Sequence, residues 1–330
     1  MHPSNPISND LLVARVLAGR AFLVKTDGCV QYYSRLKRWL TSGNQGAVVF
    51  GRPRLGKTSA TRWVLSMIQQ AFGKVPFVEV PIRKQHLQNE GAFFQFLLKC
   101  CRHKHYNRGT VADKRDRFME AMLSRARRSS IRMVILFIDE AHDLKELHYQ
   151  WLRNISNELD MAGCRLFCLL VGQPELATQR DALLLEGMEQ IVGRFMTEAW
   201  VFSGLKNANQ LKEVFAGYDG AVYPQNDNHP FISYFLPKAY SHGWRLENLS
   251  EVVWCEFEKQ WEILLIDRPI EVGMQYVAGA VTALLNLASP NDTADLKIDS
   301  KQIKNCIEQS GFKNAMKILN SIQKNPKKVK

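Results

Sequence analysis

The chain has 330 residues and 46% hydrophobic content, which is enough for one large or two modest domains with real cores. Its 44 lysines and arginines outnumber 32 acidic residues, and the formal net charge of +12 indicates an acidic partner such as nucleic acid. The sequence shows no secretory signal and no continuous span of ~20 apolar residues, so we expect a cytoplasmic protein without a membrane crossing.

The first segment, residues 1–45, is expected to be a lead-in that contains one helix. Val30, Tyr33, Leu36 and Leu40 recur at helical spacing, with a tryptophan beside the last of them. A polar stretch with two glycines then breaks the helix before the first strand.

Residues 51–58 read Gly-Arg-Pro-Arg-Leu-Gly-Lys-Thr, a complete G-x-x-x-x-G-K-T phosphate-binding loop. The apolar run 47–50 enters this loop as a predicted strand, and a predicted helix leaves it over 57–73. Because the motif needs a strand before it and a helix after it, this context favours a true phosphate-binding loop over a chance match.

Each fixed position of the loop has a chemical task. Gly51 and Gly56 let backbone N–H groups turn toward an anion, and the helix N-terminus adds its positive dipole end. Lys57 can reach the β- and γ-phosphates, and the Thr58 hydroxyl can ligate Mg²⁺. We therefore predict that ATP and Mg²⁺ bind here. The other residues expected around the nucleotide are Arg52, Pro53, Arg54, Leu55 and Ser59, of which the two arginines face either a neighbouring subunit or solvent.

Strands and helices alternate along the following part of the chain. Apolar runs predict strands over 76–81, 133–138, 164–171 and 196–202, and helices are expected over 90–102, over 144–159 and up to about residue 195. The alternation predicts a doubly wound α/β subdomain, a parallel sheet flanked by helices over 46–204, with its ligand at the carboxyl ends of the strands.

Beyond residue 204 the strand pattern stops. Residues 205–290 are expected to form a helical lid subdomain, which a short linker follows. Residues 291–330 should contain one helix, from about 300 to 323, and a basic tail.

Two acids close the apolar strand that ends at residue 138. Asp139 can hold Mg²⁺ through its water shell, and Glu140 is placed to orient and polarise the water that attacks the γ-phosphate. Together with the phosphate-binding loop, this pair predicts an ATP hydrolase.

Further groups are needed to stabilise the charge on a transferring phosphoryl group. Gln173, at the end of the next predicted strand, could contact the γ-phosphate or position the water. Arg194 could be a finger inserted into the site of a neighbouring subunit, with Arg180 as the other candidate for this role. Arg245, in the helical lid, could report bound nucleotide to that subdomain.

The positive charge is concentrated in residues 99–132, which we call the basic segment. It holds eleven lysines and arginines against three acids, a net of +8 out of the chain's +12. A cluster within it, Cys100-Cys101-x-His103-x-His105, matches no common zinc spacing, so we favour no metal there. Seven cysteines without framework spacing are typical of a reduced cytoplasm.

The order of these motifs resembles the AAA+ ATPases over about residues 20–270: the loop, the Asp-Glu strand end, a polar residue after the next strand, Gly-Arg-Phe, and Gly-Trp-Arg in a helical lid. More narrowly, Ile-Asp-Glu-Ala-His at 138–142 and Leu-Val-Gly-Gln-Pro-Glu-Leu at 170–176 are similar to transposition regulators of the TnsC and MuB kind and to secretion ATPases of the ExeA kind. The basic segment, the short basic tail and the lack of a membrane or wall-binding segment favour the TnsC branch, in its short form from CRISPR-associated elements.

This resemblance implies a nucleoid-associated regulator of DNA transposition and recombination. It would oligomerise head to tail as a ring or helical filament on double-stranded DNA and link a target-selection complex to the transposase. ATP would bind between subunits, and Arg194 of one subunit would contact the γ-phosphate held by the next. The residues that would grip the DNA backbone without reading bases are Lys99, Arg102, Lys104, Arg108 and Thr110, with Lys114 and Arg115 behind them.

Three other interpretations stay open. A secretion ATPase of the ExeA kind would have a membrane partner and would ignore DNA. A helicase-loader-like ATPase would, like the transposition regulator, bind both DNA and ATP. A nucleotide-switched scaffold would bind ATP and scarcely hydrolyse it.

Overall fold

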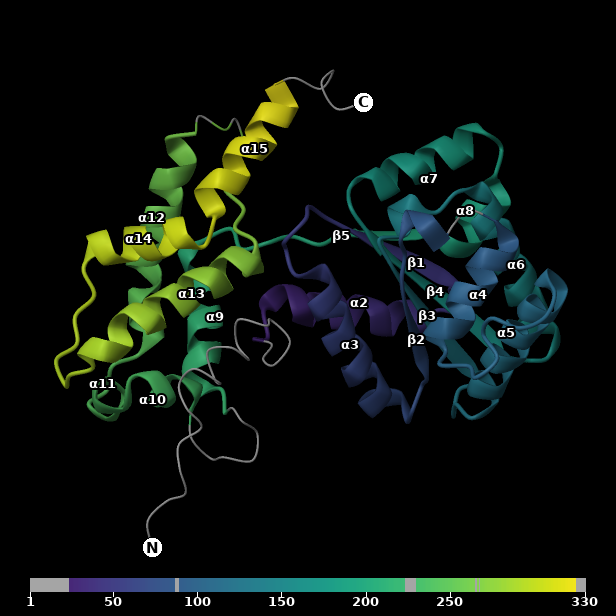
Figure 1. Ribbon diagram of the computed structural model, residues 1–330, viewed down its shortest axis with the longest axis horizontal. Coiled ribbons are helices and arrows are strands. Elements are labelled where there is room, and N and C mark those ends of the chain that lie inside the picture. The colour runs from purple at the N-terminus through teal and green to yellow at the C-terminus, as the bar shows by residue number, and fades with distance from the viewer. Residues whose placement is uncertain (1–23, 87–88, 223–229, 265, 267, 325–330) are drawn as a thin grey trace, which may run out of the picture. The chain divides into compact units, whose positions relative to one another are not determined.

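The computed structural model describes residues 24–86, 89–222, 230–264, 266 and 268–324 (Figure 1). Most of the expected lead-in, residues 1–23, the loop residues 223–229 and the basic tail at 325–330 lie outside the described residues. The described residues form two compact units. The sheet unit contains residues 29–53 and 57–202. The helical unit contains the described residues before 29, residues 54–56 and those from 203 onward.

A parallel sheet of five strands organises the sheet unit, in the order β2-β3-β4-β1-β5. The strands are β1 (Gly46–Phe50), β2 (Phe77–Pro81), β3 (Met133–Asp139), β4 (Arg165–Gly172) and β5 (Glu198–Val201). The register pairs Phe50 with Gly172 and Ile138 with Leu170, so β1, β3 and β4 end at the same edge. The sheet confirms the predicted α/β fold with parallel strands.

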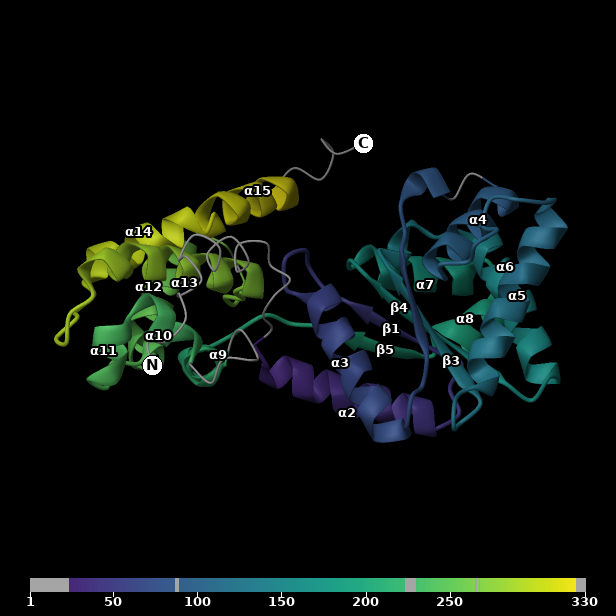
Figure 2. The ribbon, with the colours of Figure 1, turned by 60° about the horizontal axis from the view of Figure 1, so that its bottom comes forward.

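Helices cover both faces of this sheet, which explains why β3 is apolar and buried along its whole length. Figures 1 and 2 show α2 and α3 on one side of the strands and α4 to α8 on the other. The helices are α2 (Asp27–Thr41), α3 (Lys57–Phe72), α4 (Glu90–Cys100), α5 (Val111–Arg127), α6 (Glu146–Met161), α7 (Glu175–Leu185) and α8 (Glu189–Phe195).

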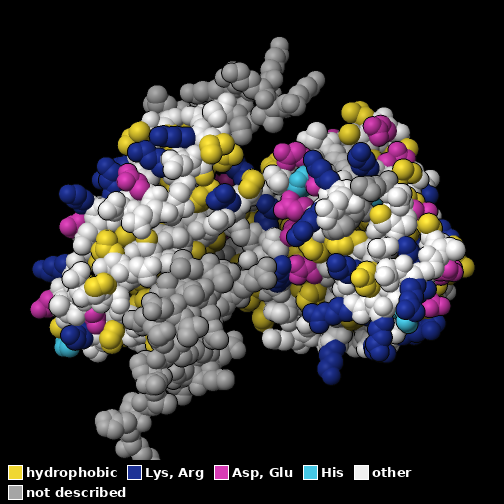
Figure 3. Space-filling model, in the orientation of Figure 1, with side chains coloured by type: hydrophobic (Ala, Val, Ile, Leu, Met, Phe, Trp, Pro, Cys, Tyr) yellow, Lys and Arg dark blue, Asp and Glu magenta, His cyan; other side chains and the backbone are white. Residues whose placement is uncertain are grey.

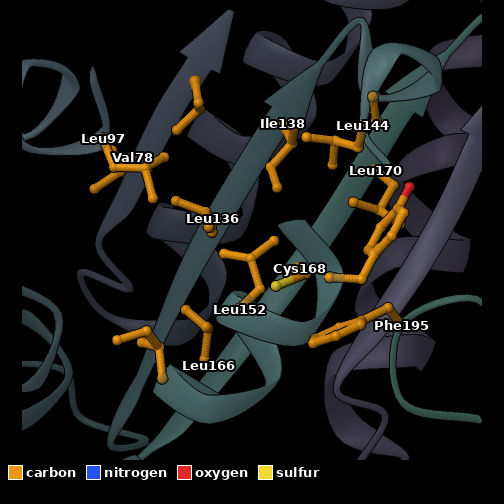
Figure 4. Close-up of a cluster of buried hydrophobic side chains, with 14 of the residues drawn as sticks. Val78, Leu97, Leu136, Ile138, Leu144, Leu152, Leu166, Cys168, Leu170 and Phe195 are labelled. Carbon is orange, nitrogen blue, oxygen red and sulfur yellow. The ribbon is translucent and has the colours of Figure 1, made fainter. Parts of the chain in front are cut away.

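One hydrophobic core lies between the sheet and the helices α4 to α8. Alternate residues of β3 and β4 point toward these helices, as the close-up in Figure 4 shows. The labelled core side chains are Val78, Leu97, Leu136, Ile138, Leu144, Leu152, Leu166, Cys168, Leu170 and Phe195, all of them buried. This core fixes the strand ends at which the functional side chains lie.

The helical unit has a second core of its own. Its helices are α9 (Ala208–Gly220), α10 (Phe231–Phe235), α11 (Pro237–Ser241), α12 (Ser250–Glu262), α13 (Met274–Ala288), α14 (Ser300–Gln309) and α15 (Phe312–Lys324). The Phe312 ring lies 5.0 Å from that of Phe257 and 5.5 Å from that of Tyr276, measured between centroids, and so joins α15 to α12 and α13.

The structure differs from the sequence-based expectation at both ends of the described chain. The single helix expected over 300–323 is two helices, because Gly311 between them takes φ +78°, a left-handed conformation that ends a helix. In α2, Tyr32 is fully buried while Val30 is 38% exposed, so the apolar face is rotated from the one predicted through Val30 and Tyr33. Within the described residues, no helix is both long and apolar enough to span a membrane.

Gly46 at the start of β1 offers a test of the packing between β1 and α8. A Cβ atom there would lie 2.7 Å from the backbone of Phe195, so Gly46→Ala should lower the free energy of unfolding by about 1–3 kcal/mol. Gly193→Ala is the matched control: its Cβ would meet nothing within 4 Å, and alanine favours α8 by up to ~1 kcal/mol. Chemical denaturation of both variants measures the difference, and equal stabilities would contradict the packing described here.

Candidate functional site

The phosphate-binding loop connects β1 to α3 and is shaped by left-handed residues. Gly56 takes φ +97° and Arg54 takes φ +68°, while the Gly51 N–H donates to the Gly172 carbonyl at 3.3 Å. The conformation at Gly56 suits glycine, because glycine has no Cβ atom. The loop therefore curls between the ends of β1 and β4 and delivers Lys57 as the first residue of α3.

The Lys57 ammonium group lies inside this loop. Its Nζ donates to the carbonyl oxygens of Gly51 at 2.7 Å and Arg52 at 2.8 Å, and only 9% of the residue is exposed. Burial lowers the pKa of this ammonium, and the carboxylates of Glu140 and Asp139 oppose the shift. A phosphate in the loop would compete with these two carbonyls for the lysine, and it would supply the negative charge that they lack.

Thr58 and Asp139 join α3 to the end of β3. The Thr58 hydroxyl donates to Asp139 Oδ2 at 2.8 Å. Burial raises the pKa of the Asp139 carboxyl, while this hydrogen bond lowers it. A hydroxyl and a carboxylate held together are hard oxygen ligands, and a divalent cation would offset the cost of burying the acid. The pair thus fits Mg²⁺, and its role as a Mg²⁺ site stays a prediction.

Glu140 follows directly in a left-handed conformation, with φ 55° and ψ 37°. Its N–H donates to Asp139 Oδ1 at 3.1 Å, and a short 3-10 turn, Ala141–Asp143, comes next. The side chain is 47% exposed, so its carboxylate can reach a water molecule, as a general base must.

The structure adds His142 to this site. Its Nδ1 lies 3.5 Å from Glu140 Oε2, and its Nε2 lies 3.5 Å from Nε2 of Gln173 at the end of β4. The sequence contained a signal for this residue, because His142 closes the Ile-Asp-Glu-Ala-His motif, yet the spacing alone gave it no task.

The other loop residues divide between exposed and packed positions. Pro53 and Arg54 are exposed and Arg52 and Ser59 are half-buried, whereas Leu55 is buried. Arg54 belongs to the helical unit, where its guanidinium carbon lies 6.0 Å from the centroid of the Tyr276 ring and its carbonyl accepts the Gln275 N–H at 3.3 Å.

The three candidate arginines all have partners within the chain. Arg194, on α8, lies 3.5 Å from Asp160, and Arg180, on α7, lies 3.4 Å from Asp181. Arg245, in the helical unit, donates to the carbonyls of Tyr240 and Trp244 at 2.9 and 2.7 Å, and its guanidinium carbon lies 3.8 Å from the centroid of the Tyr240 ring. Their roles toward a nucleotide stay predictions.

The basic segment forms the end of α4, a connecting loop and α5, a helix that the sequence analysis did not anticipate. Of the predicted DNA-binding residues, Lys99, Arg102, Lys104 and Arg108 are exposed. Figure 3 shows lysine and arginine side chains spread along the lower surface of the sheet unit, from the region of α3 to that of α5 in Figure 1.

The three remaining predicted residues are engaged locally. Thr110 is the N-cap of α5: its hydroxyl accepts the Asp113 N–H at 3.2 Å, and the Asp113 carboxylate accepts the Thr110 N–H in return. Lys114 donates to Gln95 at 2.9 Å and Arg115 to Glu90 at 3.1 Å, which ties α5 to α4.

Two further arginines hold the connecting loop. Arg117 donates to the carbonyls of His105 and Arg108 at 2.8 and 2.9 Å, and Arg125 donates to that of Cys101 at 2.8 Å.

Burial raises the pKa of the Cys101 thiol to about 11. Among the residues that the structure describes, no group of three or more His, Cys, Asp or Glu side chains could hold a metal ion.

Comparison with known proteins shows what the sheet unit is similar to. Residues 40–179 match the family described as AAA domain. No curated protein matches the chain. Three solved structures are similar in fold: the Aeropyrum pernix ORC2 protein in ADPNP-ADP complexes, the Aeropyrum pernix ORC1 protein in complex with DNA, and Drosophila ORC bound to DNA.

These likenesses are structural, at low sequence identity. The TM-scores are 0.54, 0.52 and 0.51 in that order, with identities of 9%, 13% and 11%. The alignments cover 90%, 88% and 93% of this chain and 71%, 68% and 68% of the other chains. The fold is therefore that of an AAA+ P-loop ATPase with C-terminal helices.

Proposed function

We propose that this chain is an ATP-hydrolysing regulator of DNA transposition that assembles head to tail on double-stranded DNA. The observation that carries its ATPase chemistry is the hydrogen bond between Thr58 and Asp139, beside the loop that encloses Lys57. The match of residues 40–179 to the family described as AAA domain supports the same chemistry.

The residues at the strand ends divide the work of hydrolysis. Lys57 releases its two loop carbonyls and binds the β- and γ-phosphates of ATP. Thr58 and Asp139 would hold Mg²⁺, which would supply positive charge against the phosphates. Glu140 orients and polarises the attacking water, and Gln173 contacts the γ-phosphate from the end of β4. Arg194 of a neighbouring copy, released from Asp160, stabilises the charge that develops in the transition state.

The basic segment supports the DNA-binding part of the proposal. Four of its exposed cations, Lys99, Arg102, Lys104 and Arg108, come from one helix end and one short loop, so they can grip neighbouring phosphates without reading bases. The motif resemblance to TnsC proteins supports a role between a target-selection complex and a transposase.

A helicase-loader-like ATPase is the second candidate, because it would use the same ATP site and the same exposed cations of the basic segment. Both candidates predict ATP-dependent assemblies on duplex DNA, which electron microscopy with ATP, a non-hydrolysable analogue and ADP would reveal. Rings that ignore DNA would instead favour a secretion-type motor. A pull-down with this chain as bait, and purified transposase or purified replicative helicase as prey, then separates the two DNA-binding candidates.

Lys57→Ala should abolish ATP binding and ATP-dependent assembly together, because it removes the buried ammonium group that the loop encloses. Binding of a fluorescent ATP analogue and size-exclusion chromatography measure the two effects. The control is Lys37→Ala, which removes an exposed lysine from α2. An alanine variant at 57 that still assembles with ATP would contradict the assignment of the loop.

Glu140→Gln should bind ATP normally but lower turnover by about 10²–10⁴-fold, since the amide cannot act as a general base. Assemblies on DNA should then persist in ATP instead of dissociating. Phosphate release and DNA-bound lifetime are the measurements, with exposed Glu186→Gln as the control. Rapid turnover by the Glu140 variant would remove this residue from the catalytic role.

Replacing Lys99, Arg102 and Lys104 by glutamine should weaken DNA binding and flatten its salt dependence by about one unit of slope for each lost phosphate contact. Arg127→Gln/Arg128→Gln is the control, because these exposed arginines lie at the other end of α5. Fluorescence anisotropy with duplex DNA at several salt concentrations gives both slopes. An unchanged slope in the triple variant would move the DNA-binding surface elsewhere.

A further inference from the structure

His142 lies between the predicted general base and the residue predicted to contact the γ-phosphate. Its Nδ1 is 3.5 Å from Glu140 Oε2, and its Nε2 is 3.5 Å from Gln173 Nε2. The Gln173 backbone N–H also approaches Nδ1, at 3.4 Å. One imidazole ring therefore touches two functional side chains that come from different strands.

The ring is seated in a fixed place. A Cβ atom on Gly172 would lie 3.1 Å from His142 Nδ1 and 3.3 Å from its backbone nitrogen, so the absence of a side chain there makes room for the ring. Leu176 closes the same space, since its Cδ2 would lie 3.2 Å from that Cβ. The His142 side chain is only 15% exposed, against 47% for Glu140.

The hydrogen-bonding options of the ring couple its two neighbours. With its proton on Nδ1, the imidazole can donate to the Glu140 carboxylate and accept from the Gln173 amide at Nε2. With its proton on Nε2, Nδ1 can only accept, and it then suits the Gln173 backbone N–H and repels the carboxylate. The contacts of 3.4–3.5 Å are long, so they can be exchanged at little cost.

We propose that His142 is a positioning residue that holds the Glu140 carboxylate in place for the attacking water, and that the Gln173 amide favours the tautomer that does so. One N–H of that amide can donate to His142 Nε2 and keep the Nδ1 proton facing Glu140, while its second N–H contacts a γ-phosphate. This inference rests on the proposed ATP hydrolysis and adds to it a link between nucleotide sensing and the general base.

Two substitutions separate the two contacts of the ring. His142→Asn keeps an amide where Nδ1 lies and can still donate to Glu140, whereas His142→Gln keeps an amide where Nε2 lies and can only face Gln173. We expect His142→Asn to retain kcat within about threefold and His142→Gln to lower it about tenfold. Affinity for a fluorescent ATP analogue should stay within about twofold of the unmodified chain in both, because neither amide faces the phosphate-binding loop.

The coupling itself is measured by a double-mutant cycle. His142→Ala and Gln173→Ala should together lower kcat by at least fivefold less than the product of their separate effects, because they break the same link. The control cycle pairs Gln173→Ala with His105→Ala, an exposed histidine of the sheet unit, and should be multiplicative. Melting temperatures identify any variant that fails to fold, and if the alanine variant does so, the cycle is repeated with His142→Gln.

The outcomes distinguish this inference from the proposed function. A multiplicative cycle for His142 and Gln173, or equal losses in the asparagine and glutamine variants, would overturn the role of His142 while ATP hydrolysis through Glu140 stands. A lack of ATP turnover by the unmodified chain would overturn the proposed hydrolysis and this inference with it.

Discussion

The parallel alignment of β1, β3 and β4 is the constraint on which the candidate site depends. Because the three strands run in one direction and end in register, the segments that follow them must emerge at the same edge of the sheet. The phosphate-binding loop, the Asp139-Glu140 pair and Gln173 are those segments. Residues more than thirty positions apart in sequence therefore meet within hydrogen-bonding distance, as Thr58 and Asp139 do.

The electrostatics at this edge would favour a phosphate bound together with a divalent cation. The buried ammonium of Lys57 interacts with the carboxylates of Asp139 and Glu140. Burial lowers the pKa of Lys57 and raises that of Asp139, so it destabilises the charged form of both groups. Neutral ligands would relieve neither group. A phosphate bound with a cation supplies a charge partner to both, so the same desolvation that makes the free site costly favours its occupied state.

Local motifs made the site predictable, and long-range packing made the rest unpredictable. The loop at 51–58 and the acids after the apolar strand at 133–138 carry their chemistry in contiguous residues, so the fold and the core of the site followed from them. By contrast, the contact of His142 with Gln173 depends on which strands are neighbours. The sequence analysis missed α5 because most of its residues are charged or polar. Its apolar face consists of only three buried residues, Phe118, Met122 and Ala126, and packing against the core stabilises this helix.

The hydrogen bonds by which Arg117 holds the loop between α4 and α5 have a consequence for molecular recognition. Arg117 holds the carbonyls of His105 and Arg108, so the backbone that displays Lys104 and Arg108 is already ordered before any polyanion arrives. Ordering the backbone of a flexible residue costs roughly 1–2 kcal/mol of conformational free energy. Because this loop is already ordered in the folded chain, binding does not include that cost. A charged side chain that contacts nothing outside the chain can in this way increase affinity, by making the surface around it rigid.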